Sequence, residues 1–257
     1  MATPAAVRLW RTAAQRRVRS AFNSIANARV EWQKATAEGR EAGTEVVNAQ
    51  LSKGLLVDLD LGELASLPNI KSVAQAKLTK QQVRSLERLL LAFERLEAAV
   101  SRLHSALEGF QEPPSTVSAT GSTSPTAART PDSKGGTRPS GGAVSEAASK
   151  GPVYNCLSIT TLEAIAKEMV DMFEQELDVK RQITCAIHSL VAASHNQGQG
   201  QGPGQSRHGQ HRELSSDELR SRLEVFLSAW QLEPRINSQR LEEITEMLDA
   251  EMKMPQY

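Results

Sequence analysis

A run of apolar residues spaced three and four positions apart constrains the fold of this chain more than any other feature. The run extends from Lys80 to Gly109 without an internal glycine or proline, and charged side chains fill the positions between the apolar ones. This pattern is typical of a long helix that packs through one apolar stripe, and such a helix depends on partner helices for its stability. The predicted stripe comprises Val83, Leu86, Leu90, Phe93, Leu96, Val100, Leu103 and Leu107.

Two further blocks show the same helical spacing. The first is predicted over Val18–Gln50, where Phe22, Ile25 and Trp32 share one face. Its end is expected to weaken at the glycines Gly39 and Gly43, and Gly54 is expected to interrupt the next few residues. The other block is predicted over Thr160–Val191 and opens with a capping box of Thr160 and Glu163. Its apolar face comprises Leu162, Ile165, Met169, Met172, Phe173, Leu177, Ile183, Ile187 and Leu190.

The segment between the first two blocks alternates apolar and acidic residues from Val57 to Leu61. Alternation is typical of a strand, but a single strand without a partner strand is not stable. We therefore expect a packed crossover loop with short helical turns, broken at Pro68.

Two stretches are too poor in apolar residues to offset the entropy of ordering them. Residues 112–150 are dominated by Ser, Thr, Pro, Gly and Ala, and residues 194–213 are rich in Gln and Gly. Both are predicted to be disordered linkers. The low hydrophobic fraction of the whole chain, 39%, agrees with segments that bury nothing.

Two shorter helices are predicted after the second linker. One runs over Asp217–Trp230 behind a capping box of Ser215 and Glu218, and the next begins at Asn237 or Ser238. The fold prediction is therefore all-α: an elongated bundle of long antiparallel helices with a C-terminal helical hairpin and two disordered linkers. Its parts are residues 1–111, 112–150, 151–193, 194–213 and 214–257.

Charge is balanced overall but not along the chain. The 30 basic and 30 acidic residues give a formal net charge of zero, so no global field favours nucleic acid or an anionic membrane. Residues 1–40, however, hold eight Arg or Lys against two Glu. We interpret this start as the basic face of an amphipathic helix, with an organelle transit peptide as the alternative. Arg11, Arg16, Arg17 and Arg19 near Trp10 could also bind nucleic acid, a second alternative.

No motif in the sequence indicates catalysis or a metal site. There is no phosphate-binding glycine loop, nucleophile elbow or H-E-x-x-H sequence. Cys156 and Cys185 are predicted to be buried, reduced thiols, with His188 at the edge of the core. The three histidines of the Gln/Gly-rich tract lack any pre-ordered geometry for a metal. We expect no catalytic residue, no cofactor, no metal and no membrane span.

Trp230 stands beside Pro234 in a chain with only three tryptophans. A tryptophan in the last turn of a helix, four residues before a proline, can wedge into the elbow between two helices. Burying the ring stabilises by about 2–3 kcal/mol. We favour this structural interpretation over an exposed binding hot spot.

Two separated stretches carry a family resemblance: "MFEQELDVKRQI", residues 172–183, and "LSAWQLEPRINSQRLEEITEML", residues 227–248. Together with the earlier "ARVEWQKATAEGREAGTEVVNAQL", they resemble the cyclin-dependent-kinase-interacting protein family, CINP. The segment "LASLPNIKSVAQAKL", residues 64–78, is more similar to the ribosome-maturation factor AIRIM. The matching positions are Trp32, Gly43, Asn48, Glu176, Leu177, Lys180, Arg181, Ile183, Leu227, Ser228, Trp230, Pro234, Ser238, Arg240, Leu241, Met247 and Leu248.

The resemblance implies a non-catalytic helical adaptor that acts in the nucleus. Its expected protein partners are a cyclin-dependent kinase, an origin-firing kinase, a checkpoint kinase complex, AAA+ ATPases and an AIRIM-like subunit. An AIRIM-like role in ribosome maturation is the alternative. The expected partner-binding residues are Glu176, Lys180, Arg181, Trp230, Pro234 and Arg240.

Lys180 and Arg181 are adjacent cations about 100° apart on their helix, so they face different neighbours. One is expected to pair with Glu176, a contact worth only about 0.2–0.5 kcal/mol. The other is expected to reach an acidic partner surface, or the loop containing Asp58 and Asp60. Charge reversal of both should then weaken partner capture more than stability.

Two serine- or threonine-proline pairs lie in the first linker. Ser124 and Thr130 each precede a proline and are candidate sites for a proline-directed kinase. Such pairs also occur by chance in linkers of this composition.

Overall fold

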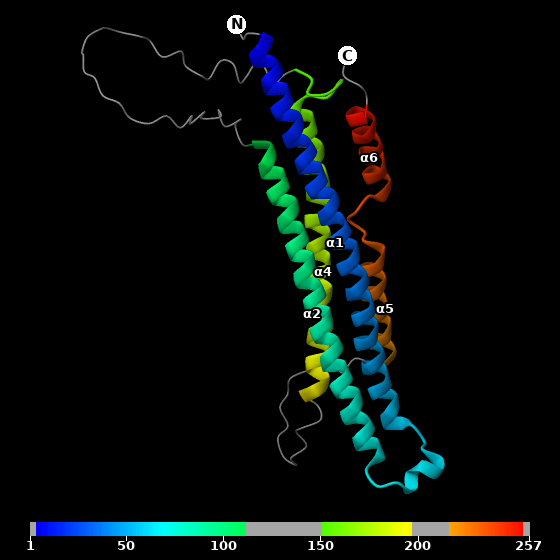
Figure 1. Cartoon of the computed structure of the whole chain (residues 1–257). Helices are drawn as coiled ribbons and strands as arrows, with labels where there is room; N and C mark the ends of the chain where they lie inside the picture. Colours follow the sequence, from blue (N-terminus) through cyan, green and yellow to red (C-terminus); the bar gives the residue numbers. More distant parts are fainter. Residues whose placement is uncertain (1–3, 112–150, 197–215, 254–257) are drawn as a thin grey trace, which may run out of the picture. The chain divides into compact units, whose positions relative to one another are not determined.

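The structure, a computed structural model, describes residues 4–111, 151–196 and 216–253 (Figure 1). Its elements are α1 (Pro4–Asp58), the short 3₁₀ helix η1 (Gly62–Ser66), α2 (Ile70–Gln111), α4 (Ile159–Asn196), α5 (Ser216–Leu232) and α6 (Ser238–Lys253). Over these residues there is no strand, only an isolated bridge between Pro152 and Ser158. The all-α prediction is therefore confirmed.

Some predictions concern residues outside those that the structure describes. They are the linker at 112–150, nearly all of the Gln/Gly-rich linker, and the candidate phosphorylation sites Ser124 and Thr130. The described part of the chain contains no helix of the length and apolar character that a membrane crossing requires.

The predicted crossover segment is much shorter than expected. Helix α1 continues through Gly39, Gly43 and Gly54 to Asp58, and α2 begins at Ile70 instead of Lys80. The alternation at Val57 to Leu61 is thus the end of a helix followed by a turn. Gly39 and Gly43 do not weaken the helix as predicted, because Trp230 and Leu227 pack where a Cβ would stand at these positions, and such tertiary contacts override the low helix propensity of glycine.

The buried face of α2 is also rotated in its first half. The predicted residues Leu96, Val100 and Leu103 are buried, but Val83 and Leu90 are exposed. The interior positions there are instead Gln82, Ser85, Leu89 and Ala92. Leucines occupy several faces of this helix, so their spacing does not specify which face is buried. The buried positions 82 and 85 carry polar side chains, which an apolar pattern does not include.

The chain forms two compact units, and α1, α2 and α4 contribute residues to both. Unit 1 comprises Met1–Ser24, His104–Met169 and Gln239–Tyr257. Its core includes an edge-to-face contact of Phe22 and Phe110, whose ring centroids lie 5.6 Å apart. The Tyr154 hydroxyl donates a hydrogen bond to the backbone oxygen of Gln15 (2.8 Å), which attaches the segment before α4 to α1.

The segment before α4 also encloses the carboxylate of Glu251 from α6. One oxygen of Glu251 accepts hydrogen bonds from the backbone N–H groups of Asn155, Cys156 and Leu157, at 2.7–2.9 Å. Helix α4 then begins with Ser158 as its cap, because the Ser158 hydroxyl accepts the N–H of Thr161 at 3.2 Å. The predicted cap at Thr160 was two residues too late.

Unit 2 comprises Ile25–Leu103 and Val170–Ser238. Helices α1 and α2 run antiparallel here, with ion pairs from Glu38 to Arg95 and from Glu45 to Arg88 (2.7 Å). Near the connection of these helices the interior is polar: the buried Lys53 donates to Gln82 at 3.1 Å, and Gln82 donates to Gln50 at 2.8 Å. Burial lowers the pKa of Lys53.

Candidate functional site

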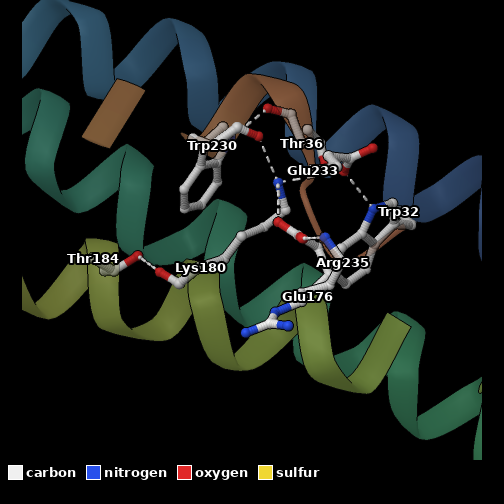
Figure 2. Close-up of polar contacts among 8 residues, drawn as sticks. All are labelled: Trp32, Thr36, Glu176, Lys180, Thr184, Trp230, Glu233 and Arg235. Carbon is white, nitrogen blue, oxygen red and sulfur yellow. Dashed lines mark hydrogen bonds and ion pairs between the residues drawn. The ribbon is translucent and has the colours of Figure 1, made fainter. Parts of the chain in front are cut away.

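A buried cluster of charged and aromatic side chains joins three helices of unit 2 (Figure 2). At its centre is Lys180 of α4, whose side chain is 0% exposed. Its Nζ donates a hydrogen bond to the backbone oxygen of Trp230 at 2.8 Å. The same Nζ lies 3.3 Å from Oε1 of Glu233 and 3.7 Å from Oε1 of Glu176. A single ammonium group therefore connects α4 to the last turn of α5 and the residue after it.

Two tryptophan rings enclose this ammonium group. Nζ of Lys180 lies 4.7 Å from the ring centroid of Trp230 and 5.7 Å from that of Trp32. Both distances are within the range in which a cation is attracted to the face of an aromatic ring. Trp32 in turn packs edge-to-face on Phe173, with ring centroids 5.3 Å apart.

The connection after α5 is fixed by hydrogen bonds to α1 and α4. Glu233 has the left-handed φ of 47°, and its Oε1 accepts the indole N–H of Trp32 (2.7 Å) and the hydroxyl of Thr36 (3.1 Å). Oε2 of Glu176 accepts the backbone N–H of Arg235 at 2.9 Å. The indole N–H of Trp230 reaches the backbone oxygen of Thr36 at 3.0 Å. These bonds specify one position of α5 on its neighbours.

The electrostatics of the cluster reflect its burial. Removal from water raises the pKa of the Glu176 carboxyl and lowers the pKa of the Lys180 ammonium, because each charged form loses its hydration. The two ion pairs and the hydrogen bonds oppose this cost. Oε1 of Glu176 has no hydrogen-bond partner, so the compensation is incomplete. Lys180 and Glu176 have no exposed side-chain surface, and their contacts hold α4 against α5 and the residues that follow it.

The expected partner-binding residues divide into two groups in the structure. Glu176, Lys180 and Trp230 lie together in the interior, each with at most 2% of its surface exposed. The expected pairing of Lys180 with Glu176 is present. The second cation was expected to reach a partner surface or the loop after α1. Arg181 instead pairs with Asp178 (2.5 Å) and Glu97 (3.3 Å) on the surface.

The structural interpretation of Trp230 is supported, since its side chain is buried and contacts both α1 and α4. Pro234 is exposed, and Arg240 forms a bidentate contact with Glu168 in unit 1, at 2.7 and 3.0 Å. The sequence patterns did not point to Glu233 or Thr36. Glu233 directly follows the helix that contains Trp230, which makes it a candidate for a contact near that ring. Nothing in the sequence, however, places its carboxylate beside Trp32.

The two cysteines correct another prediction. Cys156 and Cys185 are free and exposed, and His188 is exposed as well. Thr184 and Ile187 occupy the buried positions of this part of α4, so the apolar neighbours of Cys185 in sequence lie on a different face of the helix. In the described ranges no three side chains among His, Cys, Asp and Glu form a group suited to a metal ion.

Helix α5 has apolar side chains on two opposite faces. The inner face buries Leu223 and Trp230. The outer face carries Val225 (62% exposed), Ala229 and Leu232 (75% exposed), spaced by four and three residues. These side chains, with Pro234, line an open and largely apolar groove of about 430 Å³, bordered by Ser221, Glu224 and Ser228. We call this surface the outer α5 face.

No protein-family model matches the sequence, and no curated protein is significantly similar to it. The class that the geometry defines is an all-α helical protein with an internally fixed C-terminal segment and an exposed apolar face on α5.

Proposed function

We propose that this chain is a non-catalytic helical adaptor that binds a partner protein through the outer α5 face. The observation that carries the proposal is the second apolar stripe of α5. A surface helix needs one apolar stripe to pack on its own protein, and Leu223 and Trp230 already provide it. An additional exposed stripe is typical of an interaction site.

The shape of this surface indicates the kind of partner. Val225, Ala229 and Leu232 form a row along one helix face, which fits the apolar side of an amphipathic helix laid in a groove. Glu224 at the border of the groove already pairs with Arg220 at 2.9 Å, so the proposed recognition of the partner helix rests on the apolar row. The Lys180 cluster supports this use, because it holds α5 in one position before the partner arrives and reduces the entropy lost on binding.

From the resemblance to the CINP family, we propose which proteins supply the partner helix. They are cyclin-dependent and origin-firing kinases, a checkpoint kinase complex, AAA+ ATPases and an AIRIM-like subunit, in the nucleus. The AIRIM-like alternative differs in assigning the adaptor to ribosome maturation, and the same surface serves either proposal.

The test is affinity capture with the purified full chain, comparing wild type with the double variant Val225→Lys/Leu232→Lys. Leu9→Lys is the matched control, since Leu9 is a leucine of similar exposure, 74%, on α1. We expect wild type and control to recover kinases, replication factors or AAA+ ATPases, and the double variant to lose them. Circular dichroism and melting should be the same for all three, because the replaced side chains are exposed. Unchanged recovery by a folded double variant would exclude the outer α5 face.

A nucleic-acid-binding function is the second candidate. Arg8, Arg11 and Arg16 are exposed along the first turns of α1, where phosphates could reach them. A salt-sensitive DNA or RNA mobility shift that disappears on neutralising Arg16, Arg17 and Arg19 would favour this function over the adaptor.

A further inference from the structure

The connection between α1 and α2 presents a concentration of apolar side chains to solvent. Within unit 2, the last turns of α1, η1 and the first turn of α2 form this region, which we call the tip (Figure 1). Its large apolar side chains are each more than half exposed: Leu55, Leu59, Leu64, Leu67 and Val73. A concentration of exposed apolar side chains in one region indicates an interaction site.

Local hydrogen bonds hold the backbone of the tip in a defined conformation. The N–H of Gly62, which has a left-handed φ of 50°, donates to Oδ1 of Asp60 at 3.0 Å. The N–H of Leu64 donates to the backbone oxygen of Leu61 (3.0 Å) at the start of η1, and the N–H of Leu67 donates to that of Leu64 (3.1 Å) at its end. The backbone oxygen of Asn69, a residue with a φ of 62°, accepts the N–H of Val73 at 2.9 Å as α2 begins. The leucines therefore belong to a segment whose backbone conformation is held by hydrogen bonds.

The tip carries two exposed carboxylates, those of Asp60 and Glu63, and one exposed cation, Lys71 in the first turn of α2. Asp60 and Glu63 are both exposed among the leucines, and no ion pair in the described part of the chain involves either. A partner for this surface must supply apolar contacts together with cations.

Such a surface exists on α2 of the same chain. Lys77, Lys80 and Arg84 are exposed and follow Val73 of the tip at helical spacing, and we call these three cations the basic stripe. Over the described residues, Lys77, Lys80 and Arg84 form no salt bridge. They line an open groove of about 580 Å³ with Gln81, Ser85, Arg88 and Glu45.

We infer that two copies of this chain associate, with the tip of each copy lying on the basic stripe of the other. The carboxylates of Asp60 and Glu63 meet Lys77, Lys80 and Arg84 of the second copy, and the leucines cover its Val73. Tip and stripe lie on one hairpin: Lys80 is about 15 Å along α2 from Ile70. Two hairpins placed antiparallel about a two-fold axis make this contact twice, which closes the assembly at a dimer.

A second copy accounts for the charges better than other occupants. A nucleic acid would use the basic stripe but would be repelled by the carboxylates and would leave the leucines uncovered. Self-association requires no further molecule, and the zero formal net charge of the chain provides no overall repulsion between copies. This inference does not depend on the outer α5 face, so either proposal can fail without the other.

The test is the mass of the full chain in solution, measured by sedimentation velocity over a range of concentrations. We expect wild type to reach twice the mass of one chain. The tip variant Asp60→Asn/Glu63→Lys keeps the acceptor for the Gly62 N–H but inverts the charge, and the stripe variant is Lys77→Glu/Lys80→Glu. Each should raise the dissociation constant at least about a hundredfold, because like charges then face each other. A mixture of the two variants should pair again, since both contacts regain opposite charges.

Two further samples complete the test. Leu64→Gln/Leu67→Gln should also dissociate the dimer, whereas the control Leu9→Gln should not. A wild-type chain that remains monomeric at every concentration would overturn the inference. So would a dimer that survives the tip and stripe variants, or variants that are monomeric alone and fail to pair when mixed. A mobility shift of DNA by a monomeric wild type, lost in the stripe variant, would assign the stripe to nucleic acid instead.

Discussion

The indole ring of Trp230 occupies the space that a side chain would need at Gly39. A Cβ on Gly39 would lie 2.3 Å from Cζ2 of Trp230 and 3.0 Å from Cε2. The glycine in the middle of α1 thus gives α5 its close approach, and the ring that fills the space is the one that contacts Lys180. Gly54, about four turns later on the same helix, has nothing within 4 Å of the corresponding position.

The first prediction compares these two glycines. Gly39→Ala should lower the free energy of unfolding by about 1–3 kcal/mol, because the ring must move out of a packed site. Gly54→Ala should raise it by about 0.5–1 kcal/mol, since alanine favours a helix over glycine and meets no neighbour. Urea denaturation of both variants measures the two effects. Equal effects of both substitutions would show that Trp230 does not require the glycine.

The second prediction separates the two adjacent cations of α4. Lys180→Met should lower the free energy of unfolding by about 3–5 kcal/mol, because it leaves the carboxylates of Glu176 and Glu233 near each other without their cation. Arg181→Met removes exposed ion pairs to Asp178 and Glu97 and the approach of the guanidinium to the Phe93 ring (5.8 Å), and it should lower the free energy of unfolding by less than about 1 kcal/mol. Chemical denaturation of the two single variants tests the contrast. A small loss for Lys180→Met would mean that the cluster contributes little to the fold.

A third prediction concerns the charges of the same cluster taken together. The triple variant Lys180→Met/Glu176→Gln/Glu233→Gln removes the charges but keeps an oxygen acceptor at 176 and 233. Because replacing a whole buried ion-pair group by neutral side chains is often neutral or stabilising, we expect it to recover most of the stability that Lys180→Met loses. If the triple variant is less stable than Lys180→Met, the two carboxylates act mainly as hydrogen-bond acceptors whose charge matters.

The sequence was sufficient to predict most of the helices and the pairing of Lys180 with Glu176, but not the contacts of Lys180 with Glu233 and Trp230. Spacing at three and four residues located α2, α4, α5 and α6, and it placed Trp32 in an interior stripe. It could not locate Glu233, because the left-handed turn that directs this carboxylate to Trp32 depends on contacts 201 positions away in the chain. The exposure of Cys185 was missed for a related reason, since an apolar sequence neighbourhood does not specify which face of a helix is buried.

The fourth prediction concerns the fixation of the segment before α4. Glu251→Ala leaves the N–H groups of Asn155, Cys156 and Leu157 without their shared acceptor. It should lower the free energy of unfolding by about 3 kcal/mol. Glu251→Gln keeps an oxygen but loses its charge, so its cost should be smaller. Hydrogen exchange of these three amides provides the direct readout, with faster exchange expected in the alanine variant. Unaltered exchange there would mean that other contacts hold the segment.

The fifth prediction is a pH dependence at the α1–α2 contact. Oε2 of Glu45 accepts hydrogen bonds from Ser85 (2.6 Å) and Arg88 (2.7 Å), and these bonds lower the pKa of the carboxyl below its ordinary value of 4.5. Between the lowered pKa and 4.5 the unfolded chain binds more protons than the folded one, so stability rises with pH across this window. The contribution of Glu45 is therefore complete above about 4.5 and is lost as the pH falls through the lowered pKa.

Glu45→Gln should accordingly destabilise the protein at neutral pH, and its difference from wild type should shrink as the pH falls to about 3. Urea denaturation of wild type and variant at several pH values measures this difference. Glu242→Gln is the control, because the exposed Glu242 has no hydrogen bond or ion pair within the residues that the structure describes. A difference between wild type and Glu45→Gln that stays constant from neutral pH to about 3 would mean that Ser85 and Arg88 stabilise the carboxylic acid as well as they stabilise the carboxylate.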